Sequence, residues 1–96
     1  KKLEYATVDK IKSLPWQAAM DYAASLGEGW RLPTLEELRM KYEAGKIEDM
    51  REGYYWSSST SASCTGGAWI VSLWLGHVAG TAKANNYYAW PVRERQ

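Results

Sequence analysis

The sequence lacks phenylalanine, has one cysteine and one histidine, and contains no long apolar run. The single cysteine, Cys64, excludes an internal disulfide framework and a zinc site built from several cysteines. No apolar run approaches the roughly 18–20 residues of a membrane span, so we expect no direct membrane insertion. Lysine and arginine number 12 against 11 acids, and both signs are spread along the chain, which argues against nucleic acid as a partner.

What the chain does contain is indole and phenol in quantity, with six tryptophans and seven tyrosines in 96 residues. Both side chains combine an apolar ring with a polar group, and they are favoured where a ring must end in a hydrogen bond or at an interface. The length predicts one domain over residues 1–96. Because the sequence starts at Lys1 rather than at methionine, we expect a domain trimmed from a longer protein.

The first half predicts one strand and two helices. A short alternating segment at 3–8 is typical of an edge strand. A helix is expected from an N-cap at Ser13 to Gly27, with its apolar stripe at Trp16, Ala19, Met20 and Ala23. A second helix is expected from Thr34 to Gly45, because Thr34 and Glu37 have the capping-box spacing. The polar segment 46–53 is expected to hold one more helical turn.

After Gly53 the apolar period changes to that of strands, which we expect at 54–59, 68–75, 78–84 and 87–93. Turns are expected at 76–77 and 85–86. This order predicts an α+β fold in which two helices pack on a twisted antiparallel sheet that ends in a β-meander.

Alternation along 68–75 predicts that Trp69, Val71, Leu73 and Leu75 point inward and that Trp74 points to solvent. From Gly53 to Val92 the chain has no aspartate or glutamate. An exposed indole among uncharged polar groups is typical of a binding surface. The predicted ligand-binding residues are Ser72, Trp74, His77, Thr81, Lys83, Asn85, Asn86 and Tyr88. The alternative is that Trp74 packs on a neighbouring chain.

Four ordered motifs together resemble one family. They are GWRLPTLEEL (29–38), YWSSS (55–59), the AW that opens a strand (68–69) and YYAWPVR (87–93). The sequence is similar over residues 14–95 to the C-terminal domain of bacterial collagen-like adhesins, which has a C-type-lectin-like fold. The run SLWLGHVAGTA departs from the asparagine- and glycine-rich segment expected there.

The resemblance implies an extracellular, cell-envelope or phage-particle module that binds a protein or polysaccharide; some members recognise sulfated polysaccharides. Relatives in the wider superfamily include receptor-binding proteins diversified by retroelements, and formylglycine-generating enzymes. In such folds the WRLP segment is structural. Trp30 fills the core between helices and sheet, Arg31 satisfies backbone or carboxylate acceptors, and Pro33 directs the chain into the helix capped by Thr34.

The residues argue against an enzyme. His77 is the single histidine and lies in an expected turn, Cys64 has no nearby cation to activate it, and the oxidases of the superfamily use paired cysteines. Ser57–Ser59 are expected to form structural hydrogen bonds. No metal or other cofactor is expected, because the acids lie on or just after a helix rather than in late loops. A structural module that forms homo-oligomers at the tip of a surface or phage fibre remains the alternative function.

Overall fold

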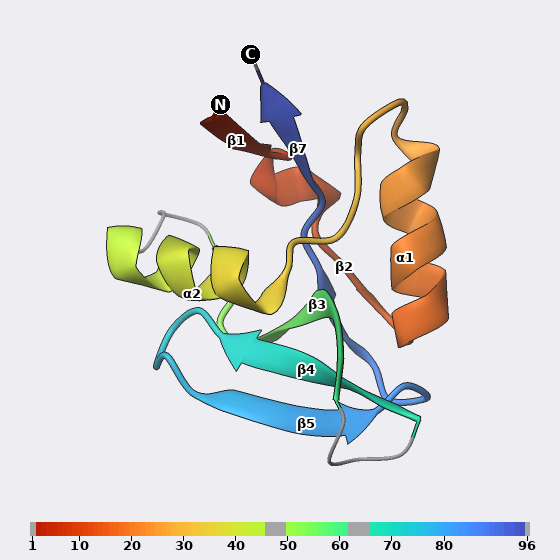
Figure 1. Cartoon of the computed structure of the whole chain (residues 1–96), viewed down its shortest axis with the longest axis vertical. Helices are drawn as coiled ribbons and strands as arrows, with labels where there is room; N and C mark the ends of the chain where they lie inside the picture. The colour runs from red at the N-terminus through yellow and green to blue at the C-terminus, as the bar shows by residue number, and fades with distance from the viewer. Residues whose placement is uncertain (1, 46–49, 62–65, 96) are drawn as a thin grey trace.

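The computed structural model describes residues 2–45, 50–61 and 66–95. The elements there confirm the α+β class, and Figure 1 shows α1 and α2 on opposite sides of the strands. In chain order they are β1 (Lys2–Tyr5), the short 3-10 helix η1 (Val8–Lys10), β2 (Lys12–Leu14), α1 (Trp16–Ser25), α2 (Leu35–Ala44), β3 (Tyr54–Ser61), β4 (Gly67–Ser72), β5 (Val78–Ala82), β6 (Tyr87–Ala89) and β7 (Val92–Arg95).

The two helices differ in how well local sequence fixes their starts. α2 begins after Thr34, whose side chain forms a full capping box with Glu37, and its C-cap is Gly45 at φ 107°, as predicted. The predicted N-cap of α1 is wrong, because Ser13 lies in β2 opposite Tyr88 and Pro15 takes the cap position. Pairing with β6 therefore outweighs the local capping preference of a serine.

The strands form a five-stranded sheet in the order β2-β6-β3-β4-β5 and a separate pair, β1 with β7. β3, β4 and β5 make the predicted antiparallel meander, but β6 crosses to the other side of β3 and bridges it in parallel through Tyr55 and Tyr88. The predicted fully antiparallel sheet is thus wrong for β6. The predicted strand at 87–93 is divided at Trp90–Pro91, where proline offers no backbone donor.

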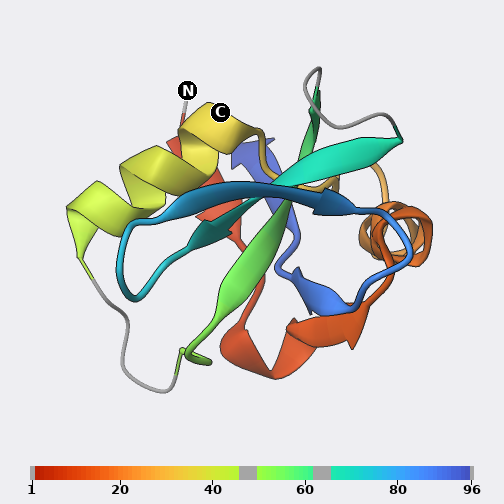
Figure 2. The ribbon, with the colours of Figure 1, turned by 90° about the horizontal axis from the view of Figure 1, so that it is seen from below.

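Two hydrophobic clusters lie on opposite faces of the large sheet. Figure 2 shows the ribbon of this sheet with β5 in front. The α2-side cluster contains Ala6, Ile11, Leu38, Met50, Tyr55, Val71, Leu73 and Trp90. The α1-side cluster contains Trp16, Ala19, Ala23, Leu32, Trp56, Ala68, Ile70 and Ala89. Because β4 contributes to both, its consecutive residues Ile70 to Ser72 are all buried, as is Leu73 directly after the strand.

Three of the tryptophans join these clusters to the backbone. The indole nitrogens of Trp16, Trp56 and Trp90 donate to backbone carbonyls at 2.9, 2.7 and 2.6 Å. Each of these side chains is at most 9 % exposed. The three indoles therefore fill the core, and the hydrogen bond of each N–H satisfies its one polar atom. The helical turn predicted within 46–53 is absent from 50–53, and residues 46–49 lie outside the described part.

Candidate functional site

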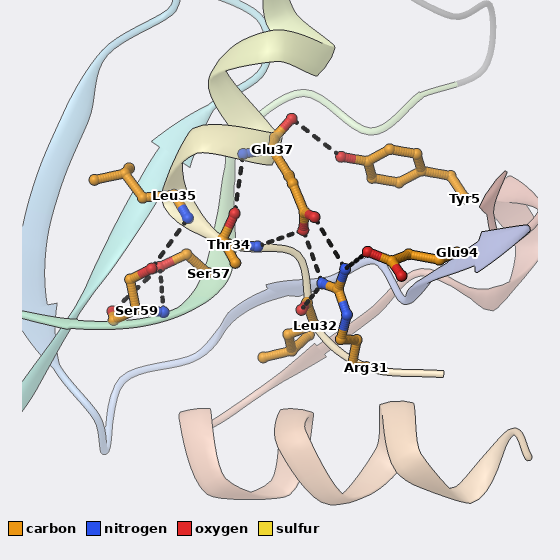
Figure 3. Close-up of polar contacts among 9 residues, drawn as sticks. All are labelled: Tyr5, Arg31, Leu32, Thr34, Leu35, Glu37, Ser57, Ser59 and Glu94. Atoms are coloured by element: carbon orange, nitrogen blue, oxygen red, sulfur yellow. Dashed lines mark hydrogen bonds and ion pairs between the residues drawn. The ribbon is translucent and has the colours of Figure 1, made fainter. Parts of the chain in front are cut away.

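Arg31 ties the connector between the helices to α2 and to the last strand (Figure 3). Its two terminal nitrogens donate to the two carboxylate oxygens of Glu37 at 2.8 and 2.9 Å. The guanidinium also donates to the carbonyl of Leu32 at 3.2 Å and lies 3.9 Å from a carboxylate oxygen of Glu94. The expectation that Arg31 satisfies backbone and carboxylate acceptors is confirmed.

Glu37 serves the same network from the first turn of α2. Its carboxylate accepts from the backbone N–H of Thr34 at 2.8 Å, and its own N–H donates to the Thr34 hydroxyl at 3.1 Å. The hydrogen bond from Arg31 is the main reason why the pKa of Glu37 lies below its ordinary value, and the same pairing raises the pKa of Arg31. These contacts give both side chains a structural role.

Trp30 is half-buried at the rim of the molecule, so the predicted core position of its ring is wrong. Its ring packs against the α2-side cluster from outside, and the Arg93 guanidinium lies 4.7 Å from the ring centroid. The connector instead buries Leu32, which is 1 % exposed, and Pro33, whose carbonyl accepts from the N–H of Ser58 in β3 at 2.7 Å. Beside Trp30 is a hollow of about 310 Å³, lined also by Glu4, Tyr5, Ala6, Thr7, Lys10 and Leu26.

The serines of β3 hold its irregular end. The Ser57 hydroxyl donates to the carbonyl of Trp69 at 2.8 Å and accepts from the N–H of Ser59 at 3.1 Å. The Ser59 hydroxyl in turn accepts from the N–H of Leu35 at 3.1 Å. These bonds lie where the β3–β4 register shifts between Trp56 and Thr60. They agree with the structural interpretation of this motif.

The outward face predicted for Ser72 and Trp74 does not form. Ser72 is 2 % exposed, and its hydroxyl accepts from the N–H of Leu75 at 3.0 Å. Trp74 is half-buried against the α2-side cluster, whereas Leu75, predicted to point inward, is 59 % exposed. The physical reason is that β4 ends at Ser72, where a turn closed by Gly76 begins, so strand alternation cannot be continued to 75.

The other predicted site residues lie in separate places. His77 is exposed in the turn before β5, and its carbonyl accepts from the N–H of Ser72 at 2.8 Å. Tyr88 lies on β6, which β3 and β4 separate from β5, and its ring is 5.3 Å from that of Tyr55 and below the Arg51 guanidinium. Both therefore lie apart from the end of β5 at Ala82.

Four of the predicted residues, Thr81, Lys83, Asn85 and Asn86, do lie together at the end of β5 and in the turn that follows it. The Asn85 side-chain amide donates to the Thr81 hydroxyl at 2.9 Å, and the Lys83 ammonium lies 4.3 Å from the ring centroid of Trp16. Asn86 is exposed in the same turn. Ligand binding by these four residues stays a prediction, because no bound molecule is present.

Trp69 is a candidate ligand-binding residue that the sequence analysis did not include, because it predicted a core position for this side chain. It was expected in the core, but it is half-buried and belongs to neither hydrophobic cluster. Within the described ranges its indole N–H has no hydrogen bond, and its ring has no ring or cation contact. On the edge strand, Gly80 is its direct cross-strand partner. The pairing of Trp69 with Gly80 could have pointed to this position, but the sequence predicts that pairing only when the register of the β4–β5 hairpin is known.

The described residues contain no group of three or more histidine, cysteine, aspartate and glutamate side chains that could hold a metal ion. Neither described helix has the length and apolar character needed to cross a membrane. Cys64 lies outside the described residues. The absence of catalytic activity therefore stays a prediction.

Comparison with known proteins gives one clear result. None of the curated proteins compared with the chain matches it. The model of one protein family, the Lcl C-terminal domain, matches residues 2–93, which is nearly the whole chain. The match covers all four motifs that carried the resemblance seen in the sequence. The chain therefore belongs to the Lcl C-terminal domain family, the C-terminal domain of Lcl-type collagen-like proteins.

Proposed function

We propose that this domain is a non-catalytic recognition module, displayed at the surface by a collagen-like protein, that binds a protein or polysaccharide ligand. Membership of the Lcl C-terminal domain family supports the surface setting. The four sequence motifs and the two helices on a mixed sheet support a C-type-lectin-like fold as the finer description. The structural role of the Arg31–Glu37 network supports a contact site elsewhere, on the strands.

The observation that carries the proposal is the surface around Trp69. We define the β5 edge surface as Trp69 of β4 together with Val78, Gly80 and Ala82 of β5. Val78, Gly80 and Ala82 are exposed, and the half-buried indole of Trp69 has its N–H available within the described structure. Gly80 is the direct partner of Trp69 in the register, so this position of β5 adds no side chain beside the indole.

The chemistry of this surface favours binding over catalysis. It offers one donor, one large ring and small apolar groups, with no acid, base or nucleophile among its four residues. Tryptophan is enriched among residues whose truncation costs an interface about 2 kcal/mol or more. A ligand would bury the ring without removing any charged group from water.

The test compares two single variants on arrays of sulfated polysaccharides, unsulfated polysaccharides and purified extracellular-matrix proteins. Trp69→Ala should lose at least tenfold in affinity for the ligands that the wild type binds. Met40→Ala, which removes a 57 % exposed apolar side chain from α2, is the matched control and should bind normally. Far-ultraviolet circular dichroism checks that both variants are folded. A folded Trp69→Ala protein with unchanged binding overturns the proposal.

A second candidate function is self-association, favoured by a different observation. Three large apolar side chains are exposed, namely Leu75 (59 %), Val78 (40 %) and Tyr42 (39 %). They form one patch, because the Tyr42 ring lies beside Gly76, which stands between Leu75 and Val78 in the sequence. An exposed apolar patch of this kind marks many protein contacts. Sedimentation equilibrium at low micromolar concentration distinguishes the two functions: a stable oligomer that Leu75→Ser dissociates supports assembly, and a monomer rejects it.

A further inference from the structure

We infer that the β5 edge surface takes up an extended, acidic peptide segment as a sixth strand of the large sheet. This inference rests on the proposed function and narrows its ligand to a protein segment. β5 is the last strand in the order β2-β6-β3-β4-β5, so among residues 2–45, 50–61 and 66–95 one side of it has no strand neighbour. It forms the lower edge of the molecule in Figure 1 and crosses the front of Figure 2.

The register of the hairpin identifies the backbone groups that face outward. The N–H of Ser72 donates to the carbonyl of His77 at 2.8 Å, which makes this a hydrogen-bonded pair of the antiparallel ladder. Hydrogen-bonded pairs recur every second residue, so Ala79 and Thr81 also turn their backbone groups toward β4. Val78, Gly80 and Ala82 consequently turn theirs away from it. The carbonyl of Ala82 is taken by the N–H of Asn85 at 3.2 Å, which closes the ladder at that end.

This edge has none of the usual protection against strand addition. Natural edge strands carry charges, proline or bulges that prevent pairing with another chain. The strand VAGTA has no charged residue and no proline, and its pairing with β4 runs from 67↔82 to 71↔78 without a register shift. An unprotected edge of this regularity fits a strand that docks there.

The size of the edge favours a short peptide over a second copy of the chain. β5 has five residues, whereas a stable protein–protein interface uses roughly 20–30 residues on each side. Charge favours an acidic segment. From Gly53 to Arg93 the chain has no carboxylate, and Lys83 follows directly after the strand.

The side chains add specificity to the backbone ladder. In an added strand, the residue opposite Gly80 would share the sheet face of Trp69, because directly paired residues point to the same face. Strands lie about 4.8 Å apart, so a branched or aromatic side chain there reaches across the glycine to the indole. We therefore expect an apolar residue at this peptide position.

The experiment uses the full domain and a synthetic heptapeptide, acetyl-Glu-Thr-Val-Thr-Val-Thr-Glu-amide. Amide hydrogen exchange should slow at least tenfold at Val78, Gly80 and Ala82 when the peptide is added. A version with lysine at both ends should bind at least fivefold more weakly. Two further versions carry N-methyl groups on alternate residues. One of them should lose binding and the other keep it, because a docked strand bonds through one edge only.

Gly80→Pro tests the same geometry from the side of the protein, since it removes an outward N–H and leaves the bonds to β4 in place. It should abolish peptide binding. If this variant does not fold, the N-methyl pair still decides the question. Equal binding of both N-methyl peptides, or protection of the three amides by self-association without peptide, overturns strand addition. Array binding that depends on Trp69 while all four peptides fail overturns strand addition alone and leaves the proposed function standing.

Discussion

Replacing Glu37 separates the two tasks of this side chain, which pairs with Arg31 and caps α2. Glu37→Gln keeps an oxygen that can accept from the backbone N–H of Thr34, because glutamine serves in the capping box, but it removes the charge. Glu37→Ala removes both tasks. Glu36→Gln is the matched control, since Glu36 lies in the same helical turn and is exposed.

The expected losses of unfolding free energy follow from these contacts. A lost helix cap costs about 1 kcal/mol. Hydrogen bonds between charged groups contribute about 1.5–3 kcal/mol when shielded, but the Arg31 side chain is 37 % exposed, so we discount the pair to about 1–2 kcal/mol. Glu37→Gln should therefore cost about 1–2 kcal/mol and Glu37→Ala about 2–3 kcal/mol, while Glu36→Gln stays within about 0.5 kcal/mol of wild type.

The pH dependence gives the same reasoning a second test. The folded-state pKa of Glu37 lies below the ordinary value of 4.5, so its contribution is complete above that value and is lost as the pH falls through the folded pKa. Urea unfolding followed by tryptophan emission should show a constant difference between wild type and Glu37→Gln from pH 7 to pH 5, and a shrinking one below. A difference under about 0.5 kcal/mol at pH 7, or one that persists at pH 2, would refute the reasoning.

Two further predictions concern the turn between β4 and β5. Gly76→Ala should lower the unfolding free energy by about 2 kcal/mol, because the φ there is +80° and an added Cβ would lie 2.7 Å from the Tyr42 ring. Thermal unfolding measures this, and adding Tyr42→Ala should relieve the steric part only; full recovery would show that the backbone is not strained. Ser72→Ala removes a buried acceptor, so we expect a loss of about 1 kcal/mol and faster hydrogen exchange at the Leu75 amide. Unchanged exchange at that amide would contradict the assigned hydrogen bond.

Local signals predicted the parts of the fold that depend on neighbours in sequence. Thr34, Glu37 and Gly45 bound α2, because a capping box and a C-terminal glycine act within one helical turn. The strands of the β3–β5 hairpins were likewise indicated by their own alternation and turns. Arg31 could be given acceptors from its motif, but not the particular carboxylates, which come from α2 and β7.

Parts that depend on distant pairing could not be predicted in the same way. Ser13 has the residue type of a helix cap, yet β6, over 70 residues later, pairs with it as a strand. The position of β6 beside β3 separates Tyr88 from β5, so residues that are close in sequence order lie on different parts of the sheet. One sequence gives no direct measure of such long-range pairings.

The error in assigning an exposed face to β4 follows from the number of faces that the sheet buries. The alternation argument assumed one buried face and one exposed face, as in many antiparallel sheets. Here the α1-side and α2-side clusters lie on opposite faces of β4, so Ile70 and Val71 are both buried and neither parity marks solvent. Both faces of β4 are covered, whereas Val78, Gly80 and Ala82 of the edge strand β5 are exposed and Trp69, the register partner of Gly80, is half-buried. The contact surface that we propose therefore lies at β5 and Trp69 rather than along a face of β4.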